Sequence, residues 1–268
     1  MTLAKVNKTL SISLAAGAAA LFLAAAPGAF AQGGNPCIAM PSHAELKQAL
    51  TLARNSSNGG FNLHMWGTVV NRDGIVCAVA FTGNDRGAQW PGSRVISAQK
   101  ANTANAFSLP GLALSTANLF SAVQPGGSLY GLQHSNPVDT DAAYGGSAQQ
   151  YGQPNDPMGN HKIGGVNVFG GGLSLYNSSG TLIGAIGVSG DTSCADHNIA
   201  WRTRHNLGLD HVPAGVSGDP ARPDNIIFDI ADDAGGNPES AGGFGHPHCG
   251  PGLPANETNI ANSLPAVP

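Results

Sequence analysis

Nine histidines are the side chains of this sequence best suited to bind a metal or a metal-containing cofactor. Neutral imidazole is the commonest protein ligand for transition metals, and it also binds haem iron. His134 precedes a long segment rich in Pro, Gly, Asn and Gln, His161 lies near the end of that segment, and His197 falls in the last predicted helix. These three are candidate ligands, with His161 and His197 preferred for the metal. Four other histidines are typical of surface or structural roles: His43, His64, His246 and His248.

Four cysteines occur in the chain, and an even number in an exported protein favours two disulfides. Three pairings are possible. We favour Cys37–Cys77, which would fix the start of the domain, together with Cys194–Cys249, which would fix the long tail. The run His246-Pro247-His248-Cys249 contains plausible metal ligands, but Cys249 is expected to be oxidised and a second ligand pair is missing.

Several local motifs are close to known catalytic or binding patterns but do not match them. Gly187-Val188-Ser189-Gly190 lacks the glycine that a hydrolase nucleophile elbow needs two positions after its serine. It is better interpreted as a turn into a helix, with Ser193 and Asp196 at capping-box spacing. Gly170-Gly171-Gly172 is not followed by the Lys-Ser/Thr of a phosphate loop. The acidic group near Asp229 does not have the ligand order of an EF-hand.

The periodicity of the sequence predicts the elements that must position these residues. Ser42 and Glu45 have the spacing of a capping box, and Asn58-Gly59-Gly60 predicts the end of the helix that follows. Strand-like runs over 63–70 and 75–82 flank turn residues, which favours a hairpin. The other predicted elements are helices over 94–107, 112–123 and 194–206, strands over 166–169, 173–177 and 181–188, and an edge strand over 226–230.

This order of elements predicts an α+β domain around an antiparallel sheet. Residues 136–164 have little periodicity and are interpreted as a loop insertion. Residues 211–268 form a Pro- and Gly-rich C-terminal extension, whose last 25 or so residues are expected to be irregular. The domain itself is expected to cover residues 32–210.

The N-terminal segment and the charge indicate the compartment. Two lysines precede an apolar run over 14–26, and Ala29-Phe30-Ala31 is typical of a cleavage site, so residues 1–31 are expected to be a signal peptide. The run is shorter than the ~20 residues that span a bilayer, so an integral membrane protein is not expected. We expect a periplasmic or secreted protein. The formal net charge is −4 without any basic block, which disfavours nucleic acid as a partner.

Four segments in order resemble one known family. They are K-A-x-T-A-x-x-F at 100–107, G-G-V at 164–166, G-A-I-G-V-S-G at 184–190 and D-x-x-I-A at 196–200. Together they resemble the GlcG/HbpS family of haem-binding proteins, also called haem-degrading or PduO-C-like, over roughly residues 44–207. The resemblance implies a profilin-like α/β/α sandwich with a five-stranded antiparallel sheet. It also implies homo-oligomers that bind haem or, in PduO-like relatives, a corrinoid.

The sequence departs from this family in the 136–164 insertion, the C-terminal extension and the cysteines, and His197 replaces a usual acidic residue. No iron ligand can be carried over residue by residue. We therefore expect an exported haem-binding protein that senses or scavenges haem. His161, His197 and then His134 are the candidates for iron, and Lys100 and Arg94 for the propionates. The alternatives are an enzyme that degrades haem or processes a cofactor, a redox-sensing accessory to a membrane sensor kinase, and a domain used for packing alone.

Overall fold

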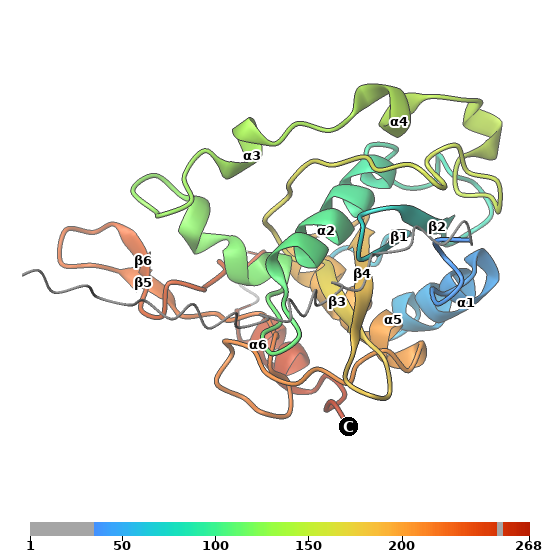
Figure 1. The fold of residues 1–268 in the computed structure, drawn as a ribbon. Helices are drawn as coiled ribbons and strands as arrows, with labels where there is room; N and C mark the ends of the chain where they lie inside the picture. The colour runs from blue at the N-terminus through green and yellow to red at the C-terminus, as the bar shows by residue number, and fades with distance from the viewer. Residues whose placement is uncertain (1–34, 251–253) are drawn as a thin grey trace, which may run out of the picture. The chain divides into compact units, whose positions relative to one another are not determined.

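A four-stranded antiparallel sheet organises the computed structural model, which describes residues 35–250 and 254–268 (Figure 1). The signal peptide expected at 1–31 lies outside the described residues. The strands run in the order β2-β1-β4-β3, so the predicted hairpin and the end of the predicted meander both contribute antiparallel pairs. Their bounds are β1 (Trp66–Asn71), β2 (Val76–Phe81), β3 (Gly172–Tyr176) and β4 (Leu182–Ser189).

The expected fifth strand is absent from the described sheet, and the prediction of a strand over 166–169 is wrong. The backbone turns at Gly164 and Gly165, whose φ values are +62° and +78°. Beyond this turn, the Asn167 amide donates to Thr103 Oγ1 at 2.9 Å, and Asn102 Nδ2 donates to the Gly165 carbonyl at 2.7 Å. The segment therefore runs along a helix and does not join the sheet.

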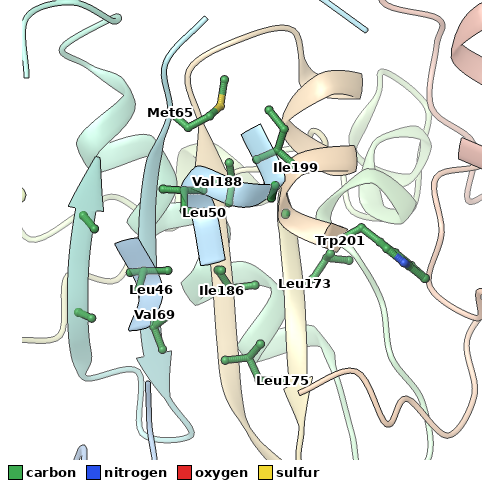
Figure 2. Packing of buried hydrophobic residues seen from close by; sticks show 14 of the residues in the cluster. Leu46, Leu50, Met65, Val69, Leu173, Leu175, Ile186, Val188, Ile199 and Trp201 are labelled. Carbon is green, nitrogen blue, oxygen red and sulfur yellow. The ribbon is translucent and has the colours of Figure 1, made fainter. Parts of the chain in front are cut away.

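Helices cover both faces of the sheet, which gives three layers. One face packs against α2 (Ser93–Phe107), and the other against α1 (His43–Arg54) and α5 (Ser193–Asn206). Leu46 and Leu50 of α1 meet Val69 and Ile186 of the sheet in the larger core (Figure 2). On the opposite face, a Cβ built at Gly187 would overlap the Ser97 carbonyl, so the glycine allows α2 to approach closely.

One of the two predicted helix caps is confirmed. The Ser42 hydroxyl accepts from the Glu45 amide at 3.3 Å, and the Glu45 carboxylate accepts from the Ser42 amide at 2.8 Å. The second prediction is wrong, because α5 is capped by Thr192, whose hydroxyl accepts from the Ala195 amide. Ser193 is thereby released for contacts with the C-terminal segment.

The 136–164 insertion folds against the domain. Its ends meet where the Asp139 amide donates to the Ile163 carbonyl at 2.7 Å. Within it lie α4 (Thr140–Tyr144) and η3 (Ala148–Gln150), and its last part pairs with the edge of the sheet, where the Val76 amide donates to the His161 carbonyl. The helix predicted over 112–123 forms two shorter 3₁₀ helices, and a short α-helix follows: η1 (Thr116–Leu119), η2 (Ser121–Val123) and α3 (Leu132–Ser135).

The C-terminal extension packs against the domain, so that Asn35–Pro268 form one compact unit. Leu264 joins the larger core, and Trp201 Nε1 donates to the Pro265 carbonyl at 2.9 Å. The predicted edge strand over 226–230 is wrong, as is the expectation of an irregular end. The extension contains a separate small sheet and a helix: β5 (Ile230–Asp232), β6 (Pro238–Ser240) and α6 (Pro254–Asn262).

None of the helices in the part of the chain that the structure describes combines the length and apolar character needed to cross a membrane.

Candidate functional site

Lys100, one of the two cations expected to meet an anionic ligand, is fully buried in an ion pair. Its Nζ donates to Asp196 Oδ2 at 2.7 Å and to the Val188 carbonyl at 3.1 Å. A Cβ at Gly171 would lie 3.1 Å from both Lys100 Nζ and Asp196 Cβ, so this glycine leaves room for the pair. Burial lowers the pKa of Lys100 and raises the pKa of Asp196 to about 6, while the pairing opposes both shifts. The Lys100 charge is thus matched inside the protein.

Arg94, the second expected cation, is also occupied. Its guanidinium forms a bidentate pair with Asp156 of the insertion, with Nε donating to Oδ2 at 2.9 Å. Its Nη1 donates to the Ala143 carbonyl at 2.7 Å, and its Cζ lies 3.7 Å from the centre of the Tyr151 ring. Arg94 therefore attaches the insertion to α2.

His197 is fully buried beneath the C-terminal extension. Asn225 Nδ2 donates to the Ala261 carbonyl at 3.0 Å, which turns Asn225 Oδ1 toward His197 Nε2, 3.2 Å away. The Ile226 amide, which can only donate, also lies 3.2 Å from Nε2, so Nε2 faces one acceptor and one donor, while Nδ1 has no hydrogen-bond partner among the described residues. Burial is the main cause that lowers the His197 pKa to about 3, so the ring is neutral.

The other two candidate histidines are exposed. His134 lies in α3, and His161 lies where the insertion meets β2. The structure thus brings together Lys100 and the helical turn that carries His197, while Arg94 lies with the insertion. Among the described residues, no hydrogen bond joins the His134 or His161 side chain to the other candidates.

An open groove runs beside the outer face of α1, and we call it the α1 groove. It has a volume of about 540 Å³, and its walls come from residues 38–41, from α1 and from the end of α5. The apolar side chains Ile38 and Leu52 are 87% and 57% exposed there. A second hollow of about 440 Å³ shares Gln48 and Leu52 with the groove and continues along α1. Both hollows are open to solvent, and their volumes fall within the range of about 300–1,000 Å³ of small-molecule sites.

His43 and Lys47 line the second hollow, and sequence reasoning did not select either residue for function. His43 Nε2 lies 2.9 Å from the Gly152 carbonyl, which is purely an acceptor, so Nε2 carries the proton. The tautomer with its proton on Nε2 has its lone pair on Nδ1. Lys47 lies one turn further along α1, with Nζ 5.3 Å from the centre of the Phe81 ring. The one available signal was the i, i+4 spacing of the two residues in a helix.

Both disulfides have the favoured pairing, Cys37–Cys77 and Cys194–Cys249, with Cα–Cα distances of 5.4 and 6.0 Å. The first fixes the segment that forms one wall of the α1 groove. The second joins the start of α5 to the C-terminal extension.

The sequence of this chain matches a known protein family. The model of a family described as haem degrading protein HbpS-like matches residues 42–204, which is more than half of the chain. The chain belongs to this HbpS-like family. The resemblance found in the four sequence segments is therefore confirmed. Among curated proteins, no sequence matches the chain.

Solved structures include several similar chains. The PduOC–haem complex is 22% identical with a TM-score of 0.42, and the match covers 61% of this chain and 89% of that one. The Klebsiella pneumoniae protein ORFY is 27% identical with a TM-score of 0.41, over 62% and 90% of the two chains. HbpS is 16% identical with a TM-score of 0.38, over 62% and 86%. The family assignment rests on the family model.

Proposed function

We propose that this HbpS-like protein binds haem in the α1 groove and its continuation along α1. The match of residues 42–204 to a haem-degrading family is the observation that carries this proposal. The lining supports the cofactor, because the exposed apolar side chains Ile38 and Leu52 lie in the groove, and its continuation adds the His43 imidazole and the Lys47 cation from the same helix. A macrocycle needs apolar surface with a few polar groups at fixed positions.

His43 Nδ1 is the proposed iron ligand, and Lys47 is the proposed partner of a propionate. The His43 ring is oriented by the hydrogen bond from Nε2 to the Gly152 carbonyl, as is usual for histidines that bind metals. His161 and His134 remain candidates, because both are exposed. His197 would reach iron after its cover by the extension opens. Lys100 and Arg94 would meet propionates after their ion pairs separate.

We also propose that the protein is exported and that haem binding serves sensing or scavenging. The two disulfides support this location, since such bonds persist in oxidising compartments. Homo-oligomers and a membrane sensor kinase as partner belong to the same proposal. Bound haem supplies a redox-active iron, and the chain's own residues would orient it and limit its access to water.

A titration with haemin followed by absorption spectroscopy tests the function. We expect a shifted Soret band that saturates at a defined stoichiometry. Replacing His43→Ala should weaken binding at least about tenfold and change the spectrum, whereas Lys47→Ala should weaken binding and leave the spectrum unchanged. Matched variants His161→Ala and His197→Ala test the ligands chosen from the sequence.

Each contrary outcome of this titration would indicate a different ligand, cofactor or function. An unchanged spectrum for His43→Ala together with a changed one for His161→Ala would move the ligand to the insertion. No spectral change with the folded, disulfide-bonded wild type would contradict haem binding and lead to a titration with a corrinoid. Loss of the Soret band with product formation, when a reductant is added, would indicate a haem-degrading enzyme.

A further inference from the structure

Three potential metal ligands gather where the C-terminal extension meets the start of α5. The ligand atoms of Cys194, His246 and Cys249 all lie within 4.8 Å of one another. Cys194 and His246 are buried, and Cys249 is partly buried. The run His246–Cys249 has no second ligand pair close to it in the sequence. The fold brings one more potential ligand, Cys194 of α5, to this run. The cluster is separate from the α1 groove, whose lining includes none of these residues.

The His246 ring is already oriented for a metal. Its Nδ1 lies 2.7 Å from the Pro247 carbonyl and must donate its proton to that acceptor. The lone pair is therefore on Nε2, which lies 3.0 Å from the Ser193 hydroxyl. A hydrogen bond from the second ring nitrogen to a carbonyl is typical of histidines that bind metals.

Polar groups surround the Cys249 sulfur and would also stabilise it as a metal ligand once the disulfide is broken. The Cys194 amide, at the N-terminus of α5, lies 3.0 Å from Cys249 Sγ and donates to it. The amides at a helix N-terminus carry partial positive charge, which is favourable beside an anionic ligand atom. The Ser193 hydroxyl lies 3.3 Å from the same sulfur. Two thiolates and one imidazole form a ligand set that Zn²⁺ prefers.

We propose that reduction of the Cys194–Cys249 disulfide creates a Zn²⁺ site formed by Cys194 Sγ, Cys249 Sγ and His246 Nε2. A dithiol reductant supplies two electrons and two protons and becomes a disulfide, while the S–S bond breaks and two thiols form. Zn²⁺ then displaces both thiol protons to solvent. The Ser193 hydroxyl or a water completes four-coordination. In the oxidised protein the sulfurs are bonded to each other, so metal binding depends on the redox state.

Metal analysis of the full chain, before and after reduction, tests this proposal. The protein is treated with dithiothreitol, freed of reductant without air, equilibrated with Zn²⁺ and passed through a desalting column. We expect close to one tightly bound Zn²⁺ per reduced chain and none per oxidised chain. Co²⁺ in place of Zn²⁺ should give the intense absorption of thiolate ligation and the visible bands of tetrahedral geometry.

Single substitutions separate this site from other ligands. Cys249→Ser and His246→Ala should each weaken Zn²⁺ binding by about 100-fold or more in the reduced protein. His248→Ala is the matched control, since its ring is held by Glu257 at 2.9 Å, and it should keep the full stoichiometry. Equal binding by the oxidised chain, or by His246→Ala, would overturn the proposal. So would a reduced chain that loses its near-ultraviolet circular dichroism and does not regain it with Zn²⁺.

Discussion

At the scale of single residues, His197 links the stability of the fold to pH. The neutral ring is buried, and its pKa is lowered to about 3, compared with the ordinary value near 6.5. Because the folded pKa lies below the unfolded one, the unfolded chain binds the proton more tightly. The contribution of the neutral His197 ring to the free energy of unfolding is therefore fully present above about pH 6.5 and is lost as pH falls toward 3.

Replacing His197→Gln should remove this pH dependence, since the glutamine amide offers both a donor and an acceptor to Asn225 and Ile226 but does not titrate. Below pH 6.5 the free energy of unfolding of the wild type should fall relative to the variant by about 1.4 kcal/mol per pH unit. Urea denaturation at several pH values between 7 and 4.5 measures this difference. His134→Gln, at an exposed position, serves as the control. Parallel pH profiles for the wild type and His197→Gln would show that the ring does not titrate as described.

Two of the buried cations were selected from the sequence as partners of propionates, but their actual partners inside the protein were not foreseen. Lys100 and Arg94 were selected as cations without a visible partner, and their aspartates lie 96 and 62 residues away in the chain. Helical spacing reveals partners within about four residues, whereas these pairs form because separate elements pack together. His43 was passed over for a related reason. Its value as a ligand depends on the Gly152 carbonyl, 109 residues distant, which fixes the ring proton.

At the scale of elements, the 136–164 insertion depends on α2 for its position. Asp156 accepts from Arg94 and also from the Gly152 and Met158 amides, at 2.6 and 2.8 Å. One buried carboxylate therefore connects the helix to the backbone turns of the insertion. Met158 and Ile163 are buried in the smaller core, so the insertion also supplies apolar contacts.

Replacing Arg94→Leu should destabilise the fold by about 3–5 kcal/mol, because Asp156 would remain buried without its counter-ion. The measurement is the urea midpoint, together with the rate of proteolysis within residues 136–164, which should rise. Arg86→Leu removes an exposed guanidinium nearby in the sequence and should have little effect on either quantity. An Arg94→Leu variant with wild-type stability and protease resistance would refute a structural role for the pair.

The regular elements were predictable because their patterns are local. Leu46 and Leu50 repeat at helical spacing, and Asn71–Gly74 has the residues of a hairpin turn, so α1, β1 and β2 appeared near their observed bounds. The segment over 166–169 has strand-like residues and still forms no strand. The Asn167 amide bonds to the Thr103 side chain of α2, and this competition between sheet and helix is decided by tertiary contacts.

At the scale of the whole molecule, the C-terminal extension is part of the folded unit. Arg204 of α5 forms a fully buried bidentate pair with Asp224 of the extension, at 2.6 and 2.8 Å. Leu264 lies in the same core as Trp201. The composition of residues 211–268 suggested an irregular appendage, because Pro, Gly and Asn are common in loops. Composition does not show that buried groups of the domain, such as the Arg204 guanidinium, have their hydrogen-bond partners in this segment.

The Arg204–Asp224 pair distinguishes one cooperative unit from a domain with a detachable tail. If the chain unfolds as one cooperative unit, Asp224→Ala leaves the Arg204 charge buried and unpaired. The substitution should then lower the free energy of unfolding of the whole chain by about 3–5 kcal/mol. Asp219→Ala breaks the partly exposed pair with Arg222 in the same segment, and pairs near the surface contribute about 1 kcal/mol or less. Calorimetry of both variants should give a single transition, shifted strongly for Asp224→Ala alone. A detachable tail would instead leave the main transition at its wild-type temperature, since Arg204 would then regain water as the extension lifts away.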